Sequence, residues 1–250
     1  MSLHIGTAGW ALPAAERGRF GDGASILARY ATRLNAVEIN SSFYRPHRPS
    51  TYARWAASVP GGFRFAVKMP RTITHERRLA DCKVLLEAFL GECGALGEKL
   101  GPLLVQLPPS LPFDPHTDFF AVLRARFAGA IVCEPRHPSW FTAAADALLK
   151  DQKIARAAAD PARVPLAAEP GGDTRFAYFR WHGSPRVYYS DYALAELEAL
   201  AARLPAKAWC IFDNTALGHA TANALALRDL TARQAGRRNA RDDAADCRPR

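Results

Sequence analysis

Short apolar runs alternate with longer stretches of helical periodicity along most of the chain. Eight runs are predicted to be strands: LHIGTAGW (3–10), AVEIN (36–40), FRFAVKMP (63–70), PLLVQLP (102–108), AIVCEPR (130–136), KIARAAAD (153–160), RFAYFRWHG (175–183) and AWCIFDN (208–214). Helices are predicted over 24–34, 51–59, 81–96, 118–127, 143–150, 191–204 and 223–234. This alternation is typical of βα units with a parallel sheet. Eight units predict an α/β fold with a single (β/α)8 domain, a TIM barrel, and no strand is followed by a Rossmann or Walker glycine pattern.

Polar residues within these runs keep to one face of each predicted strand. Because side chains alternate between two faces along a strand, residues two apart share a face. The pairs are Glu38 with Asn40, Glu134 with Arg136, Arg156 with Asp160, and Arg180 with His182, and Lys68, Gln106 and Asp213 extend the set to three further runs. Most of them lie late in their strands, the end at which barrel enzymes assemble their sites. The pattern predicts a polar pocket inside that end of the barrel.

A structural role is the alternative for each of these charged residues. Glutamate and arginine inside a barrel can pair with one another, and buried ion pairs often contribute little net stability. Polar groups that arrive from seven strands at one rim favour a functional pocket for the set as a whole. Aromatic residues in the loops around that rim, Tyr44, Trp140, Phe141, Tyr188 and Tyr189, are expected either to contact a ligand or to pack against the protein.

Composition places the chain among ordinary globular proteins. Its 250 residues are 49% hydrophobic and 23% charged, which is enough for one large core. Five cysteines without CxxC or finger-like Cys/His spacing support neither a disulfide framework nor a structural zinc site. We find no leader-like start and no apolar run long enough to span a bilayer, so a cytoplasmic location without membrane association is expected. The oligomeric state stays open.

Positive charge is concentrated at the end of the chain. The net charge is +9, and the last twenty residues hold six arginines against three aspartates. We therefore expect a barrel domain over residues 1–230 and a basic, flexible tail over 231–250. The remaining excess, about +6, attracts anions in general without proving a nucleic-acid partner.

Several of these segments carry a resemblance to a known family. IGTAGW, the long segment from VEINSSFYRPHRPS to PRTITHERRL, LGPLLVQLPPS, EPRHPSWF, FRWHG and GHATANALAL resemble the YecE-like family, known as domain of unknown function 72. The resemblance implies a TIM-type barrel and a family without an established activity. It also implies a set of characteristic positions, which here are Glu38, Asn40, Phe43, Tyr44, Lys68, His75, Gln106, Pro108, Pro109, Glu134, Arg136, His137, Trp140, Asp160, Arg180, His182, Gly183, Asn214 and Asn223.

The chain departs from the family pattern at two places. Ala8 stands where the family usually has serine, which removes one hydroxyl from the rim. Nearer the end, Asp213 stands where an amide is expected and Thr215 where a carboxylate is expected. A family role for that carboxylate would pass to Asp213 or be lost.

Binding of an anion is the first chemistry that fits these residues. Lys68, Arg136 and Arg180 would hold a phosphate-like group, with arginine supplying forked donors. Glu134 or Glu38 would act as base and His182 as acid, in hydrolysis or lyase chemistry on a phosphorylated sugar or a nucleic-acid backbone. The residues predicted to line the substrate pocket with these are Asn40, Tyr44, Gln106, His137, Trp140, Asp160, Asp213 and Asn214.

Binding of a divalent metal is the second chemistry. Glu134, Asp160, His182 and Asp213 come from successive strands, in an order that resembles the metal site of xylose-isomerase-like barrels, which include sugar isomerases, epimerases and endonucleases. Such ligands suit manganese, magnesium or zinc. Arg136 and Arg180, each two positions from a proposed ligand, oppose a second cation.

Two further hypotheses stay open. Because no GxSxG, HExxH or triad-like motif occurs, a non-catalytic barrel that binds a ligand or partner is one of them. Lys68 as a Schiff-base lysine is the other, since the chain has six lysines against 27 arginines.

Overall fold

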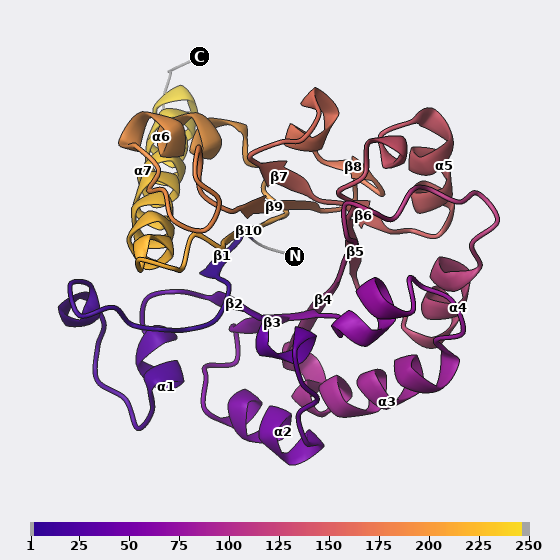
Figure 1. The fold of residues 1–250 in the computed structure, drawn as a ribbon. Helices are drawn as coiled ribbons and strands as arrows, with labels where there is room; N and C mark the ends of the chain where they lie inside the picture. The colour runs from indigo at the N-terminus through magenta and orange to yellow at the C-terminus, as the bar shows by residue number, and fades with distance from the viewer. Residues whose placement is uncertain (1–2, 247–250) are drawn as a thin grey trace.

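Parallel strands and the helices that connect them make up most of the chain (Figure 1). The computed structural model describes residues 3–246, with side chains through residue 236. The strands are β1 (His4–Thr7), β2 (Ala36–Ile39), β3 (Arg64–Lys68), β4 (Leu100–Gln106), β5 (Ile131–Glu134), β6 (Ala155–Arg156), β7 (Ala158–Asp160), β8 (Gly171–Gly172), β9 (Ala177–Trp181) and β10 (Ala208–Phe212). The α-helices are α1 (Ile26–Tyr30), α2 (Pro49–Ala57), α3 (Lys83–Cys93), α4 (Phe119–Arg126), α5 (Ala143–Asp151), α6 (Leu194–Arg203) and α7 (His219–Asp246).

Short helical turns follow several strands. They are 3-10 helices at Arg17–Arg19, Ser41–Phe43, Gly94–Lys99, Pro138–Trp140 and Pro165–Ala168, and a π-helix at Thr72–Glu76. Residue types that favour the first positions of a helix begin three of the α-helices. Ser25 caps α1, and Thr142 caps α5 by accepting a hydrogen bond from the backbone N–H of Ala145. Pro49 opens α2, where its missing N–H is not needed.

Each predicted apolar run overlaps a strand and each predicted helical stretch overlaps a helix. The sixth run holds two strands, β6 and β7, and β8 was not predicted because two residues carry no pattern. Helix α7 continues to Asp246, well past the predicted end at residue 234. Alanine and arginine favour helix without any apolar face, so this extension has a local cause. The predicted tail includes residues 247–250, which lie outside the described residues, and its division from the domain stays a prediction.

The strands form two sheets within residues 3–246. One sheet has the order β1-β10-β9-β7 and the other β2-β3-β4-β5-β6-β8. All pairs are parallel except β6 with β8. The α/β fold with parallel strands is therefore as predicted, whereas one closed ladder of eight strands is not what the hydrogen bonds show.

A side chain separates the two sheets where β1 approaches β2. The Tyr30 hydroxyl accepts a hydrogen bond from the Thr7 backbone N–H and donates one to the Ala36 carbonyl, both at 2.9 Å. It replaces a direct backbone pair between the strands. Beyond this point the backbone segments that follow β1 and end β2 pair directly, since the Gly9 N–H donates to the Glu38 carbonyl at 2.8 Å.

The sheets approach one another again at the predicted sixth strand. Its first half, β6, pairs with β5 and its second half, β7, pairs with β9. The chain therefore leaves one sheet and enters the other within a few residues. Figure 1 shows the consequence, a ring of strands around a common centre with the helices outside.

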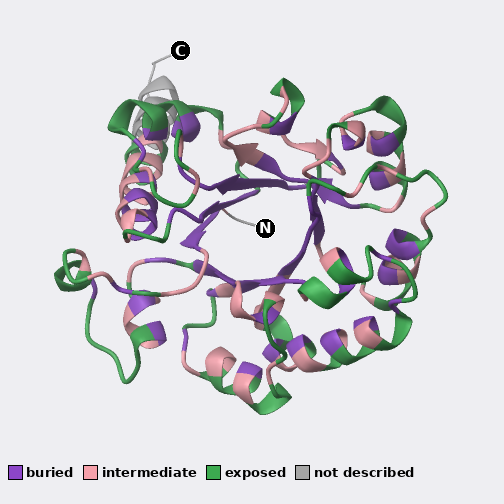
Figure 2. Cartoon of the chain, in the orientation of Figure 1, coloured by how far each residue is buried: buried purple, intermediate pink, exposed green. Residues whose placement is uncertain are grey.

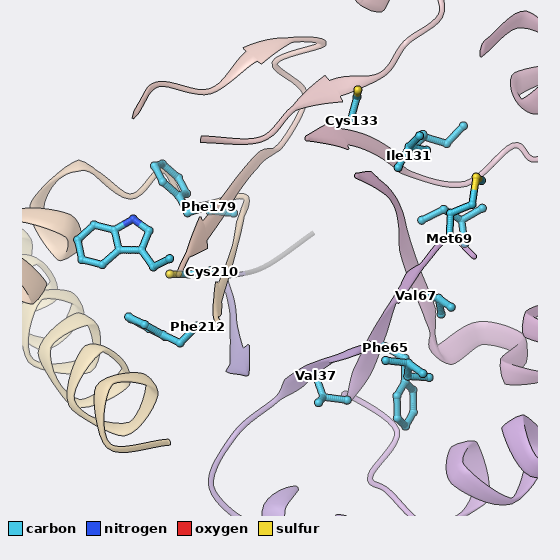
Figure 3. Close-up of a cluster of buried hydrophobic side chains, with 14 of the residues drawn as sticks. Val37, Phe65, Val67, Met69, Ile131, Cys133, Phe179, Cys210 and Phe212 are labelled. Atoms are coloured by element: carbon cyan, nitrogen blue, oxygen red, sulfur yellow. The ribbon is translucent and has the colours of Figure 1, made fainter. Parts of the chain in front are cut away.

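Apolar side chains occupy both sides of this ring, but unequally. The outward-facing residues pack under the helices and form the larger core, which includes Val37, Phe65, Cys133, Phe179 and Phe212. Figure 3 shows these side chains directed away from the centre of the ring. A smaller cluster fills the inside and includes Ala66, Leu104, Val132, Tyr178 and Ile211. Figure 2 shows that most strand residues are buried, that parts of β7 and β8 are only partly buried, and that exposed residues lie in the outer helices and loops.

Candidate functional site

Polar side chains converge just above the smaller apolar cluster, where the strands end. Glu38, Lys68, Gln106, Glu134 and Arg180 lie on five different strands and share parity with the inward-facing residues two positions before them. His182 and Asp213 follow β9 and β10 at the same parity. All seven are buried. The structure brings these seven residues together, and we call them the polar cluster.

Arg180 is the centre of the polar cluster. Its side chain is 0% exposed and contacts three carboxylates. Nη2 lies 2.7 Å from Glu38 Oε1 and 2.9 Å from Asp213 Oδ2, and Nη1 lies 3.1 Å from Glu134 Oε2. Nε adds a bond of 3.0 Å to Glu38 Oε2. The guanidinium group therefore holds together side chains from β2, β5, β9 and the end of β10.

Tyr178 belongs to the same arrangement and was not predicted. It lies two residues before Arg180 on the inner face of β9, and its hydroxyl donates to Glu38 Oε2 at 3.0 Å. Burial and the Glu38 charge raise the pKa of the Tyr178 phenol well above 10, so it stays a donor. Strand parity was the signal that could have found it, because Tyr178 shares a face with Arg180.

The charges of these groups stabilise one another. Burial raises the pKa of the Glu134 carboxyl, but Arg136 and Arg180 outweigh burial and hold that pKa well below its usual range. Burial likewise raises the pKa of the Asp213 carboxyl, but the attraction of Arg180 outweighs it, and that pKa is lowered. Both carboxyl groups are therefore ionised in the folded protein at neutral pH.

His182 lies between two carboxylates. Its Nε2 is 3.0 Å from Glu134 Oε1 and its Nδ1 is 3.1 Å from Asp213 Oδ2. Gly183 follows at φ +94°, and a Cβ there would lie 2.9 Å from the Ser190 carbonyl oxygen, so the turn that aims His182 needs glycine.

Arg136 lies at the edge of the polar cluster and is partly open to solvent. Its Nε and Nη2 donate to Glu134 Oε1 at 3.1 and 2.9 Å, and the side chain is 19% exposed. Nη2 also lies 3.2 Å from His182 Nε2. Gln106 Nε2 donates to the same Glu134 oxygen at 3.3 Å. Arg136 thus covers the pair formed by Glu134 and His182.

Lys68 differs from the arginines because it has no carboxylate within ion-pair distance in residues 3–246. Its Nζ lies 4.1 Å from the centre of the Phe43 ring, and the residue is 5% exposed. Burial first, and then Arg180, lower the pKa of the Lys68 ammonium group to about 8 against the opposing effect of the carboxylates. A change of charge at Lys68 is therefore accessible near neutral pH.

A cavity of about 260 Å³ opens beside the polar cluster. Its walls come from the ends of β5, β7 and β9 and from the loops after them, and are formed by Glu134, Pro135, Arg136, Ala159, Pro161, Ala162, Arg163, Ala167, His182 and Val187. A wider hollow of about 620 Å³ borders Leu3, Asn35 and Arg228, away from the polar cluster. The smaller cavity is the one next to the ionisable groups of Glu134, Arg136 and His182. The sequence pattern did not indicate its wall residues Arg163 and Val187.

Asp160 and Arg156 do not face the centre, and the prediction that they do is wrong. Asp160 stands opposite Trp181 in the ladder between β7 and β9, and Arg156 stands opposite Cys133 in the ladder between β5 and β6. Both partners point outward. Asp160 Oδ1 accepts a bond of 2.7 Å from the Tyr192 hydroxyl. The inward positions of this strand pair are alanines, Ala157 in the inner apolar cluster and Ala159 in the cavity wall.

Three loop residues that were predicted to line the pocket form hydrogen bonds within the protein. Trp140 is 1% exposed and donates from Nε1 to the Leu111 carbonyl at 3.0 Å, so it packs in the core. His137 Nδ1 accepts from the Ser139 N–H and caps a short helix. Asn214 Nδ2 donates to the Ser190 carbonyl and to Asn223 Oδ1. These residues shape the loops around the polar cluster.

Two rim residues keep groups available for other contacts. Tyr44 is 68% exposed, next to Phe43 at the end of the loop that follows β2. Asn40 Oδ1 is buried and has no hydrogen-bond partner within the described part of the chain. A buried acceptor without a partner is costly, so a donor from a ligand or water would stabilise Asn40.

The four residues of the metal hypothesis are only partly brought together. Glu134, His182 and Asp213 are neighbours, whereas Asp160 is bonded to Tyr192 on the other face. The oxygens that face His182 also pair with Arg136 or Arg180. Among residues 3–246 no group of three or more His, Cys, Asp and Glu side chains could hold a metal ion. The arrangement fits pairing with arginine better than metal ligation.

A family model decides what kind of protein carries this polar cluster. The model described as "Protein of unknown function DUF72" matches residues 4–246. The chain belongs to the DUF72 family. The resemblance found in the sequence motifs is thereby confirmed.

Relatives of known sequence and structure agree with this assignment. The "UPF0759 protein YecE" of Escherichia coli strain K12 and that of strain O157:H7 are each 31% identical over 144 residues, which is 56% of this DUF72 chain. The match spans about half the length, 50%, of these curated relatives. They are similar to this chain along that segment.

Solved structures of DUF72 proteins share the fold. A crystal structure from Thermotoga maritima has a TM-score of 0.75 at 23% identity and covers 92% of this chain and 99% of its own. One from Enterococcus faecalis has a TM-score of 0.75 at 22% identity, covering 92% and 95%. At these identities the likeness concerns the fold alone. Separately, no helix within residues 3–246 is both long and apolar enough to cross a membrane.

Proposed function

We propose that the polar cluster binds the anionic group of a small substrate, such as a phosphorylated sugar or a nucleic-acid backbone. We further interpret the two sheets as one distorted (β/α)8 barrel, interrupted by Tyr30 and by the break between β6 and β7. In a barrel, the ends of β2, β3, β5 and β9 face the same opening, and that opening is where barrel enzymes bind substrates.

The observation that carries the proposal is the difference between the cations. Arg180 is fully buried and its donors are directed at Glu38, Glu134 and Asp213, so it has a structural role. Arg136 Nη1 and Lys68 Nζ, in contrast, have no hydrogen-bond or ion-pair partner in the part of the chain that the structure describes. Anion binding is therefore assigned to Arg136 and Lys68 rather than to Arg180.

Charge balance around the opening supports the same conclusion. Three cations, Lys68, Arg136 and Arg180, oppose the three carboxylates of Glu38, Glu134 and Asp213. Arg163, on the wall of the adjacent cavity, adds a further cation. An anion above this group would compensate that excess positive charge.

Glu134 and His182 are the pair best placed for proton transfer. Both line the cavity and they contact one another at 3.0 Å. Glu38 lies beneath Arg180 with no exposed surface, so it supports the pair without reaching a substrate. Hydrolysis or elimination at a phosphate-bearing substrate needs one base and one acid of this kind. The metal-dependent alternative is disfavoured because Arg136 and Arg180 already engage the required carboxylates.

The test of anion binding is a thermal shift measurement. Phosphate or a phosphorylated sugar at about ten times Kd should raise the Tm by roughly 2–5 °C, because it binds only the folded state. The effect should weaken with added sodium chloride, which screens the charges. Arg136→Ala should remove most of the rise, and Arg136→Lys should restore only part of it because lysine lacks the forked donors.

Arg175→Ala is the matched control, since Arg175 is an exposed arginine near the start of β9. It should leave the ligand-dependent rise unchanged. The proposal is abandoned if phosphate, sulfate, sugar phosphates and short oligonucleotides all leave the Tm of the unmodified protein unchanged. It also fails if Arg136→Ala yields unfolded protein, which would make Arg136 a structural partner of Glu134.

A further inference from the structure

Lys68 has the surroundings of a reactive amine. Of the six lysines in the sequence, it is the buried one, at the carboxyl end of β3, while the exposed group includes Lys83, Lys150, Lys153 and Lys207. Its Nζ lies over the face of Phe43, and within residues 3–246 no carboxylate holds it in an ion pair. An amine without a salt-bridge partner is free to lose its proton and use its lone pair.

The charges that face Lys68 from the surrounding strands act in opposite directions. Arg180 on β9 opposes protonation, while Glu38 on β2, Glu134 on β5 and Asp213 after β10 favour it. The three carboxylates are occupied by Arg180, Arg136 and His182, so their attraction for Lys68 is weakened. Burial decides the balance, and the pKa of Lys68 falls to about 8. Part of the Lys68 population therefore carries a neutral, nucleophilic amine near neutral pH.

We propose that Lys68 forms an imine with a small carbonyl compound that carries a carboxylate or phosphate group. The substrate class follows from Arg136, which acts on His75 together with Lys68 and has an Nη1 without a partner in the described residues, so that it would hold the anionic group while the amine meets the carbonyl carbon. This inference rests on the proposed anion site, since the same molecule must occupy both.

The reaction needs no other reagent. The neutral Nζ attacks the carbonyl carbon, a C–N bond forms, and the carbonyl electron pair moves to oxygen. One proton passes from nitrogen to that oxygen, giving a carbinolamine. The hydroxyl group then leaves as water with the second amine proton, and a C=N bond remains between Lys68 and the substrate carbon. Carbonyl plus amine thus becomes imine plus water, with no change in oxidation state.

Reductive trapping tests the proposal directly. The full chain is incubated with pyruvate in one sample and dihydroxyacetone phosphate in another, each with sodium cyanoborohydride, which reduces an imine to a stable amine. Intact-mass measurement and peptide mapping then locate the adduct. We expect one adduct per chain at Lys68, at least tenfold above that at exposed Lys83, with at least one probe. Labelling with pyruvate alone indicates a 2-oxo acid, and labelling with the phosphate alone indicates a sugar phosphate.

Lys68→Arg removes the primary amine, so the adduct at position 68 should disappear while the exposed lysines are labelled as before. The phosphate-dependent rise in Tm of the unmodified protein tests the anion site separately. Arg136→Ala should reduce trapping at Lys68 and leave labelling of Lys83 unchanged. Imine formation is ruled out if neither probe labels Lys68 above Lys83. If trapping occurs but phosphate never shifts the Tm, Lys68 is reactive and the anion site is wrong.

Discussion

Arg180→Met should lower the free energy of unfolding by about 3–5 kcal/mol, the usual cost of removing one partner from a buried ion pair. The variant leaves Glu38, Glu134 and Asp213 buried without the cation that contacts all three. Methionine fills a similar volume, so the loss reflects charge more than packing. Urea unfolding at pH 7, followed by circular dichroism, measures it.

The difference between Arg180→Met and the unmodified protein should shrink as the pH falls from 7 towards 4. In the unmodified protein the pKa values of Glu134 and Asp213 are lowered, so their stabilisation is present above their ordinary pKa values and is lost on acidification. In the variant, Asp213 loses the main charge that opposes burial, so its pKa rises, whereas Glu134 keeps Arg136, and acid then neutralises the carboxylate that is left without an arginine. The two stability curves therefore converge at low pH.

A double variant keeps this prediction testable if Arg180→Met does not fold. Glu38→Gln combined with Arg180→Met removes a buried carboxylate that has no other arginine partner in the described residues, and should be more stable than Arg180→Met alone. Arg175→Met, at an exposed position, is the matched control and should change the free energy of unfolding by less than about 0.5 kcal/mol. An Arg180→Met protein as stable as the original would show that Arg180 is held for a ligand and not for the fold.

Lys68→Met should raise the free energy of unfolding by about 3 kcal/mol at pH 7. The pKa of Lys68 falls from 10.5 to about 8 on folding, and each pKa unit corresponds to about 1.36 kcal/mol. Below pH 8, Lys68 is charged in both states, and the folded state bears the full cost of the buried charge. Methionine of similar length removes that cost and packs against Phe43.

The pH dependence of this stabilisation has a definite sign. Between about pH 8 and 10.5 the unfolded chain binds a proton at Lys68 that the folded chain does not, so the free energy of unfolding of the unmodified protein rises with pH. The advantage of Lys68→Met should therefore decline across this window. The free energy of unfolding should be measured in buffer without phosphate or sulfate, because a bound anion would stabilise the charged lysine.

Lys83→Met, at an exposed position on α3, is the control and should change stability by less than about 0.5 kcal/mol. If Lys68→Met is less stable than the unmodified protein at pH 7, Lys68 is a structural cation and both proposals that use it lose their basis. A more stable Lys68→Met would show that the chain keeps this lysine at a cost, as proteins do at functional sites.

Much of the fold and part of the site could be predicted from local pattern. Alternation with period two marked Glu38, Glu134 and Arg180 as inward-facing because large apolar residues of opposite parity flank them, and these pack under the helices. The same rule failed for Arg156 and Asp160. Arg156 lies between two alanines and Asp160 follows another, and alanine is small enough for either face, so only the register with Cys133 and Trp181 decides the orientation.

The sequence by itself determined which elements form, their order, the family, and which strands bring charged residues to one end. Only the tertiary structure decided how those charges pair: Arg180 contacts Glu38, 142 residues away, whereas Lys68 is left without a partner in the described residues. It also decided that the Tyr30 hydroxyl separates β1 from β2. The physical reason is that parity and propensity are properties of neighbours along the chain. Pairing depends on distances of a few ångströms between side chains from different strands, and those distances exist only once the ring of strands has formed.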